Sequence, residues 1–538
     1  MVRIRRCFWQ VIPHLLGLAL SAATPCSAQQ FLPDDPLART PEVVPVGKTD
    51  VQNINALYDF AHNSFHYKNK AATESLAVNT LGKVPDSSWF TNRDTRNLTV
   101  EEVKRGGRVH GGPQPPYTVV AAKTEGVSTG FRLRDARGRL FFVKADPPSN
   151  SEMATAADVV GSLFLYAAGY NVPENYILVG HTEEFRLAEK ATMKSISGKD
   201  RRLTADELRQ LFDRIPRELD GRIRLMASLS LPPKIVGPFR YAGVRSDDAN
   251  DLVPHERRRD LRGLAVLYAW LNHTDAKGEN SLDTVEGQGE SARFVHHLLD
   301  FGDCFGSDSD IAKDPRHGQE YILLPMTWSR AYTLGLHPAN WETVDYPHEM
   351  KAVGNFTADA FDPLTWKANY PNPAFVEMTT LDGYWGAKRV MAFRDEQIRA
   401  IVEEGRFQDP RVVDYITKVL KSRRDAIGRA WFSQVLPLEA FRIVEGDLTF
   451  DDLAVQYGFS SPNQYQFNWF VWHNEAQQKK EVSASRDTAL PDTLKSLAVG
   501  SYIGCRVALE HADKRSVTVY FRREGENWKL VGISRTTL

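Results

Sequence analysis

The residues that could carry chemistry lie in two short segments. Residues 273–280 read His-Thr-Asp-Ala-Lys-Gly-Glu-Asn, and 300–302 read Asp-Phe-Gly. Phosphoryl transfer needs a carboxylate that orients an attacking hydroxyl, and it needs an amide oxygen and a second carboxylate to hold a divalent cation against phosphate oxygens. Asp275, Asn280 and Asp300 offer these groups in that order. The two segments therefore predict a phosphoryl-transfer centre.

The sequence between the two segments favours a hairpin that would bring them together. Residues 281–285 form a short, half-apolar segment, and residues 286–291 contain two glycines. Residues 294–299 form a mainly apolar segment that ends directly before Asp300. The same residues have a simpler interpretation. Asp275 could cap a helix end, and the later residues could belong to ordinary turns.

The order of these groups resembles a known pattern. The two segments follow the pattern H-x-D-x-K-x-x-N and then D-F-G. This pattern resembles the catalytic and metal-binding loops of the protein-kinase-like superfamily. The resemblance covers about residues 116–436 and implies an α+β, bilobal kinase-like fold. A small antiparallel sheet lobe (116–190) would pack against a helical lobe (191–436). Mg²⁺ and ATP, or another nucleotide, would bind between the lobes.

The resemblance implies a role for each polar residue of these loops. Asp275 would accept or orient the proton of the acceptor, and Lys277 would support the transferred phosphoryl group. Asn280 and Asp300 would coordinate Mg²⁺. His273 would brace the loop through hydrogen bonds rather than transfer protons.

Three segments with alternating apolar residues predict the antiparallel strands of the first lobe: 117–123, 131–135 and 139–145. The first connection carries Gly126, Ser128 and Gly130, whose backbone donors could approach the phosphates of a nucleotide. It lacks the G-x-G-x-x-G spacing. An ordinary hairpin loop is an equally good interpretation.

Lys144 ends the third strand, where the resemblance implies a contact with the phosphates. Glu152 opens a predicted helix that ends near Gly169, and a Lys144–Glu152 ion pair would orient the lysine. The run from Lys144 to Pro173 resembles the HipA-like bacterial kinases, and the minimal loops resemble the CotH-like kinases. Alternatively, Glu152 only favours the helix N-terminus through the dipole.

A helix predicted over 254–271 would deliver the catalytic loop into a cleft. Residues 303–310 carry several carboxylates without a full calcium-loop spacing, and we interpret them as a solvated loop. The region after Gly302 shows no A-P-E sequence, which departs from protein kinases. Further helices are predicted over 384–393, 395–404 and 410–432.

The flanking regions differ from this core. Residues 29–115 are polar and rich in proline, and we expect an extension anchored on the core by Trp89 and Phe90. Residues 437–538 predict a small C-terminal β domain. Its Trp469 and Trp472 could stack on sugars, although packing inside the domain is the better interpretation.

The first 28 residues are typical of a signal peptide. Arginines at positions 3, 5 and 6 precede an apolar run from Val11 to Ala23 and the small residues Ser27 and Ala28. We expect export to the periplasm or the extracellular space, with no membrane span in the mature chain. Cys304 and Cys505 would then remain, and the sequence leaves open whether they pair.

Composition narrows the function further. Sixty-seven basic and sixty-eight acidic residues give a net charge of -1, which argues against a nucleic-acid partner. We therefore expect an exported phosphotransferase acting on a protein, lipid or glycan acceptor. Two alternatives stay open: a non-catalytic envelope protein that binds a glycan or a protein, and a metal-dependent hydrolase using His296, His297, Asp300 and Asp303. The second is weaker, because adjacent histidines on a strand point to opposite faces.

Overall fold

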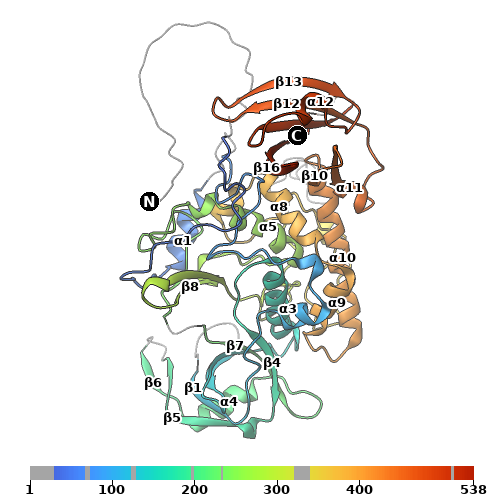
Figure 1. Ribbon diagram of the computed structural model, residues 1–538. Helices are drawn as coiled ribbons and strands as arrows, with labels where there is room; N and C mark the ends of the chain where they lie inside the picture. The colour runs from blue at the N-terminus through green and yellow to red at the C-terminus, as the bar shows by residue number, and fades with distance from the viewer. Residues whose placement is uncertain are drawn as a thin grey trace.

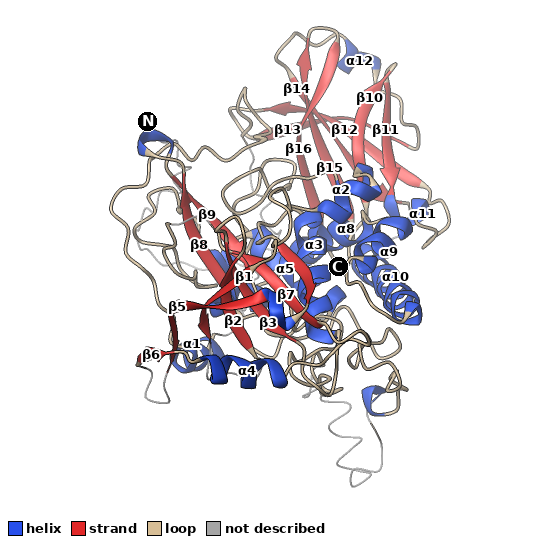
Figure 2. Ribbon diagram, turned by 90° about the horizontal axis from the view of Figure 1, so that it is seen from below, coloured by secondary structure: helices blue, strands red, loops and turns tan. Residues whose placement is uncertain are grey.

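A computed structural model describes residues 30–66, 73–122, 129–194, 199–231, 234–319, 338, 340–510 and 514–538. The protein has a mixed α/β fold. Figure 1 shows a seven-stranded sheet at the bottom, a group of helices in the middle and a five-stranded sheet at the top. Figure 2 shows most of the helices on the side of the seven-stranded sheet that faces the five-stranded sheet.

The seven-stranded sheet has the strand order β4-β7-β3-β2-β1-β5-β6. All its neighbouring strands are antiparallel except β1 and β5, which run parallel. The strands are β1 (Tyr117–Ala122), β2 (Gly130–Arg134), β3 (Leu140–Ala145), β4 (Asn175–Gly180), β5 (Phe185–Lys194), β6 (Asp200–Arg202) and β7 (Ile223–Leu229).

This sheet is larger than the sequence predicts. Strands β6 and β7 follow residue 190, where the first lobe was expected to end, and β7 inserts between β3 and β4. The parallel pair β1–β5 also departs from the expected antiparallel sheet. One face is buried under helix α4 (Ala205–Asp213), whose Leu208, Leu211 and Phe212 join the same apolar cluster as the strands.

The central helices share a second, larger apolar cluster. Helix α10 has the predicted bounds because Asp409 caps its first turn and Pro410 occupies the first helical position, where no backbone donor is needed. Every residue of α5 is buried. These helices are α3 (Met153–Ala168), α5 (Arg259–Leu271), α8 (Thr380–Met391), α9 (Asp395–Glu403) and α10 (Pro410–Phe432).

The N-terminal extension adds α1 (Ala56–Ser64) and α2 (Val100–Arg105). Trp89 and Phe90 are buried, as predicted for its anchors. The Trp89 ring stacks on His296 of the hairpin β8 (Ser281–Glu286) and β9 (Arg293–Leu298), with 3.6 Å between ring centroids. The extension is therefore fixed to the segment that joins the two candidate motifs.

The C-terminal residues form a five-stranded antiparallel sheet and the hairpin β10–β11. Trp469 and Trp472 are both buried, which confirms packing rather than sugar stacking. The remaining elements are α7 (Pro373–Val376), β10 (Leu438–Val444), β11 (Asp447–Asp452), α11 (Leu453–Gln456), β12 (Tyr465–His473), β13 (Gln478–Ser485), α12 (Asp492–Lys495), β14 (Tyr502–Leu509), β15 (Ser516–Glu524) and β16 (Asn527–Thr536).

No helix in the described part of the chain is long and apolar enough to cross a membrane. Cys304 and Cys505 are both free and buried, so they do not pair.

Candidate active site

Lys144 lies near the end of β3, where Gly130 of β2 and Met226 of β7 flank it. Its Nζ atom is 2.5 Å from Oδ1 of Asp300 and 3.5 Å from Oδ2 of Asp158. Burial alone would lower the pKa of Lys144, but the two carboxylates outweigh it and raise that pKa. Lys144 is therefore held as a cation between two acidic groups.

The acidic partner from α3 is Asp158, and the predicted Lys144–Glu152 ion pair is wrong. Oδ1 of Asp158 accepts from the Phe301 backbone N–H at 3.1 Å and from Nδ2 of Asn175 at 3.1 Å, while its Oδ2 faces Lys144. Asp158 thus connects the helix, the sheet and the Asp-Phe-Gly segment.

Glu152 points elsewhere. It precedes α3 with a φ of 66°, and its carboxylate accepts from the Gln408 backbone N–H at 3.2 and 3.3 Å. The sequence did contain a signal for the correct residue. Asp158 is the only acidic or basic residue within α3, and it lies between apolar neighbours, where a charge needs a partner.

The candidate catalytic loop, residues 273–280, begins where α5 ends, at Asn272 in the left-handed conformation. Nδ2 of Asn280 donates to Oδ2 and to the backbone carbonyl of Asp275, at 2.9 Å each. Nζ of Lys277 also lies 2.9 Å from Oδ2 of Asp275. Oδ1 of Asp275 is buried and has no hydrogen-bond partner among the described residues. The structure thus brings Asp275, Lys277 and Asn280 together and leaves one carboxylate oxygen uncommitted.

A buried ion pair holds this loop in place. Oδ2 of Asp303 accepts from the backbone N–H groups of Thr274 and Asp275 at 2.6 and 3.0 Å, and it lies 2.8 Å from Nζ of Lys313. Burial would raise the pKa of Asp303, but Lys313 and His273 lower it well below its usual range. The interpretation of residues 303–310 as a solvated loop is therefore wrong for Asp303.

His273 is fully buried, with Nδ1 at 3.4 Å from Oδ2 of Asp303. Its ring packs on Tyr268 and Phe301. His273 therefore supports the loop through ring packing and its proximity to Asp303, and the predicted hydrogen bonds are wrong, because neither ring nitrogen has a hydrogen-bond partner among the described residues.

The hairpin β8–β9 brings the two motifs together. The Leu299 backbone N–H donates to the Asn280 carbonyl at 2.9 Å, directly before Asp300. Asp300 has a φ of 59°, a conformation that few residues other than glycine adopt. Burial would raise the pKa of Asp300, but Lys144 and, to a smaller extent, His273 and Lys277 lower it. Asp300 is therefore an ionised carboxylate close to the catalytic loop.

Asn280 and Asp300 carry side-chain oxygens of the kind that a magnesium ion prefers. Oδ2 of Asp300 and Oδ1 of Asn280 take part in no hydrogen bond within the described ranges, and hard oxygen ligands are what Mg²⁺ prefers. No cluster of three or more His, Cys, Asp or Glu in these ranges could hold a metal ion. Mg²⁺ usually keeps few protein ligands and completes its shell with phosphates and water.

Of the three residues predicted to cover the phosphates, the structure describes Gly130. Gly126 and Ser128 lie outside the described residues. Gly130 is the first residue of β2, and a Cβ atom there would lie 3.0 Å from the Val143 carbonyl. Gly130 therefore serves close packing beside Lys144.

The residues proposed for a hydrolase do not converge. Nδ1 of His296 lies 2.7 Å from Asp283, and Nε2 of His297 lies 3.0 Å from the Thr284 hydroxyl. Burial lowers the pKa of His297 to about 4. With Asp303 bound to Lys313, these groups have structural partners, and the hydrolase alternative is wrong.

No family model matches the sequence, and no curated protein matches it. Two solved structures are similar over most of their length. A Golgi casein kinase with Mn/ADP bound is 9% identical, with a TM-score of 0.26, covering 74% of this chain and 94% of that chain. A second structure of the Golgi casein kinase is 10% identical, with a TM-score of 0.21, covering 74% and 97%. Similarity this low carries no weight here, so function is inferred from the geometry of the site.

Proposed function

We propose that this protein is an exported, kinase-like phosphotransferase that moves the terminal phosphoryl group of a magnesium nucleotide, such as ATP, to a protein, lipid or glycan acceptor. The ion-pair chain Asp158–Lys144–Asp300 is the observation that supports this most strongly. It connects helix α3, the sheet and the loop after β9 at the point where the catalytic loop ends. The export part of the proposal comes from the leader sequence, residues 1–28.

The chain's own groups suit the separate tasks of this reaction. The Lys144 ammonium would neutralise phosphate charge after exchanging Asp300 for a phosphate oxygen. Asn280 and Asp300 would hold Mg²⁺, which supplies positive charge against the phosphate oxygens. Lys277 would support the transferred phosphoryl group.

Asp275 would receive the proton. The acceptor oxygen would bond to the terminal phosphorus as the bond from that phosphorus to the bridging oxygen breaks, and the acceptor's proton would pass to the carboxylate of Asp275. Its uncommitted Oδ1 atom is suited to this step, because Asn280 and Lys277 already hold Oδ2.

Thermal unfolding of the protein without its leader, with Mg²⁺ and a non-hydrolysable ATP analogue, tests nucleotide binding. We expect a rise in Tm for the wild type that Asp300→Asn abolishes. Labelled ATP then tests transfer, which Asp275→Asn should reduce at least about 100-fold, as loss of a general base does. No rise in Tm with any nucleotide would favour the alternative, a non-catalytic envelope protein on the same scaffold.

A further inference from the structure

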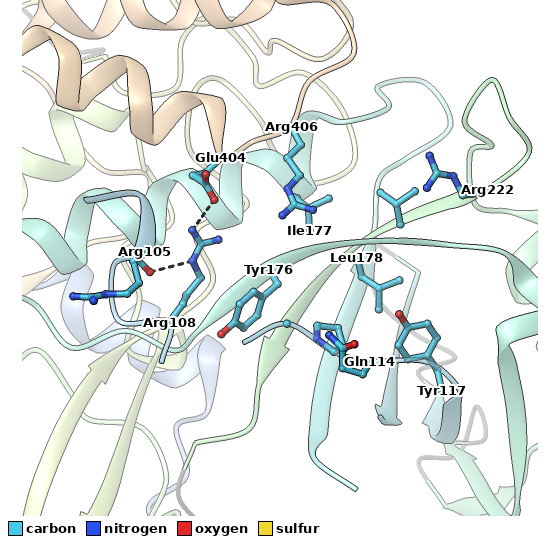
Figure 3. A pocket seen from close by; sticks show the side chains of 13 residues that line it. Arg105, Arg108, Gln114, Tyr117, Tyr176, Ile177, Leu178, Arg222, Glu404 and Arg406 are labelled. Carbon is cyan, nitrogen blue, oxygen red and sulfur yellow. Dashed lines mark hydrogen bonds and ion pairs between the residues drawn. The ribbon is translucent and has the colours of Figure 1, made fainter. Parts of the chain in front are cut away.

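A cavity lies at the edge of the seven-stranded sheet, away from the Lys144 centre. Strand β4 forms that edge, and β7 separates it from β3, which carries Lys144. The cavity has a volume of about 570 Å³ and is lined by the end of α2, residues 112–114, residues 176–179 of β4 and the turn 404–406 (Figure 3). Small-molecule sites typically occupy roughly 300 to 1,000 Å³, so this cavity is large enough for a ligand bigger than one phosphate.

The lining of this cavity is strongly basic. Arg105, Arg108, Arg222 and Arg406 line it, against the single carboxylate of Glu404. Glu404 lies 2.6 Å from Arg108, and Arg222 has an exposed partner, Asp220, at 2.7 Å. An excess of positive charge in a concave site attracts anions.

Arg105 and Arg406 are the two arginines of this lining whose guanidinium groups make no hydrogen bond or ion pair with any described residue, and both residues are exposed. Figure 3 shows Arg406 pointing toward Ile177, between Arg108 and Arg222. Water can solvate the exposed guanidinium of Arg406, so this group is available to bind an anion in the cavity without first giving up a carboxylate partner.

The turn that carries Arg406 is fixed before any ligand binds. Arg406 has a φ of 49°, and the buried Arg224 donates to its carbonyl at 2.8 Å and also to the Gly405 carbonyl. The same Arg224 donates to the Thr155 hydroxyl of α3 at 2.9 Å. A fixed backbone lowers the entropy cost of binding.

We infer that this cavity binds a phosphorylated or sulfated small molecule. Its anionic group would contact Arg406, whose planar guanidinium matches phosphate and sulfate oxygens, and Arg108 and Arg222 would add positive charge around it. Its uncharged part would lie against Tyr117 and Leu178. This site is separate from the Lys144 centre and does not depend on the proposed transfer activity.

Calorimetric titration of the full chain tests the inference, with inorganic tripolyphosphate at low salt and without divalent cations. We expect binding that Arg406→Gln weakens about tenfold, because one charge-assisted contact is lost. Arg222→Gln should weaken it similarly. Arg399→Gln is the matched control, because Arg399 is an exposed arginine of α9 that pairs with Asp414, and it should change Kd less than about twofold.

Two outcomes would overturn the inference. Equal weakening by Arg399→Gln would show unspecific attraction to surface charge. If Lys144→Met loses binding while Arg406→Gln and Arg222→Gln bind like the wild type, the probe binds at the Lys144 centre. Glucose 6-phosphate and glucose 6-sulfate separate the two sources of the anion. The inference is supported if either compound binds and Arg406→Gln weakens that binding. It is refuted if neither compound binds and Arg406→Gln leaves the affinity for tripolyphosphate unchanged.

Discussion

Lys144 has two carboxylate partners that come from different parts of the fold. Asp300 is half exposed, whereas Asp158 is buried and fixed by Asn175 and by the Phe301 backbone. Asp300 is therefore the partner that can turn toward a cation. Asp158 is the partner that keeps the ammonium in position, which is a positioning role rather than a catalytic one.

Replacing Asp158 by asparagine should therefore weaken nucleotide binding. Asparagine keeps an acceptor for Phe301 and removes the charge that holds Lys144, a loss of about tenfold in affinity. Titration of a fluorescent ATP analogue with Mg²⁺ measures it. Glu152→Gln should bind like the wild type, because Glu152 contacts Gln408 instead. An equal loss in both variants would contradict the assignment of Asp158.

The buried ion pair between Asp303 and Lys313 should contribute to the free energy of unfolding in a way that depends on pH. Asparagine at position 303 leaves Lys313 buried without its counter-ion, which typically costs about 3 to 5 kcal/mol of unfolding free energy. Because the folded-state pKa of Asp303 lies below its unfolded value, its contribution is present at neutral pH, begins to decrease below about pH 4, and is lost as the pH falls through the lowered folded-state pKa.

Urea unfolding at pH 7 and at pH 3.5 measures both effects. The difference between the wild type and Asp303→Asn should be large at pH 7 and smaller at pH 3.5. Asp314→Asn is the control, because Asp314 pairs with Arg316 on the surface, where such pairs contribute less than about 1 kcal/mol. A difference that stays constant between the two pH values would rule out a charge effect.

The sequence identifies residues whose spacing is local and misses those whose partners are distant. Asp275, Lys277 and Asn280 lie within one loop, so their spacing alone indicates that they can meet. Asp158 and Lys313 have partners that depend on how α3 and the loop after β9 pack. The position of Glu152 at the helix start favours it as the partner of Lys144, but proximity along the chain does not determine which face a side chain occupies.

At the scale of elements, α3 packs directly on the Asp-Phe-Gly segment. A Cβ atom at Gly161 would lie 2.8 Å from Cβ of Phe301 and 3.0 Å from Sγ of Cys304. Glycine is thus required by the close approach of the helix to residues 301–304. This contact determines where Asp300 stands relative to Lys144.

Gly161→Ala should lower stability and nucleotide affinity together. The added methyl group must push α3 away from Phe301, and overpacking of this kind costs about 1 to 3 kcal/mol. Thermal unfolding with and without Mg²⁺ and the ATP analogue measures both. Gly47→Ala is the control, since no heavy atom lies within 4 Å of a Cβ there. A variant with lower Tm but an unchanged nucleotide shift would separate α3 packing from the site.

The elements were predicted better than their order in the sheet. Strands near 117–122, 130–134 and 140–145 and helix α10 follow from periodicity and capping. Strand β7 was missed because Ile223–Leu229 is a short buried run between loops, and nothing local shows that it inserts between β3 and β4. Its place depends on pairing with strands about 50 to 80 residues away in the sequence.

At the scale of the whole molecule, the N-terminal extension connects the separate parts. Phe31 is buried in the C-terminal sheet against Phe470, Trp472 and Tyr520. The Asn474 side chain accepts a hydrogen bond from the Phe31 backbone N–H and donates one to the Phe31 carbonyl. Further along, Trp89 is buried against the β8–β9 hairpin. The extension therefore attaches the β domain to the segment that holds Asn280 and Asp300.

Removing the Phe31 ring should loosen that attachment. Burial of a phenylalanine in a packed site contributes about 3 kcal/mol, so Phe31→Ala should destabilise the C-terminal sheet by up to that amount. Urea unfolding followed by tryptophan fluorescence measures it, and Leu37→Ala, an exposed position, should change the free energy of unfolding by less than about 0.5 kcal/mol.

Asn474→Ala removes the same attachment from the other side. The double variant Phe31→Ala, Asn474→Ala should therefore lose less than the sum of the two single losses, because residues in contact are coupled. Strict additivity would mean that the two residues act independently, and the attachment through Phe31 would have to be abandoned.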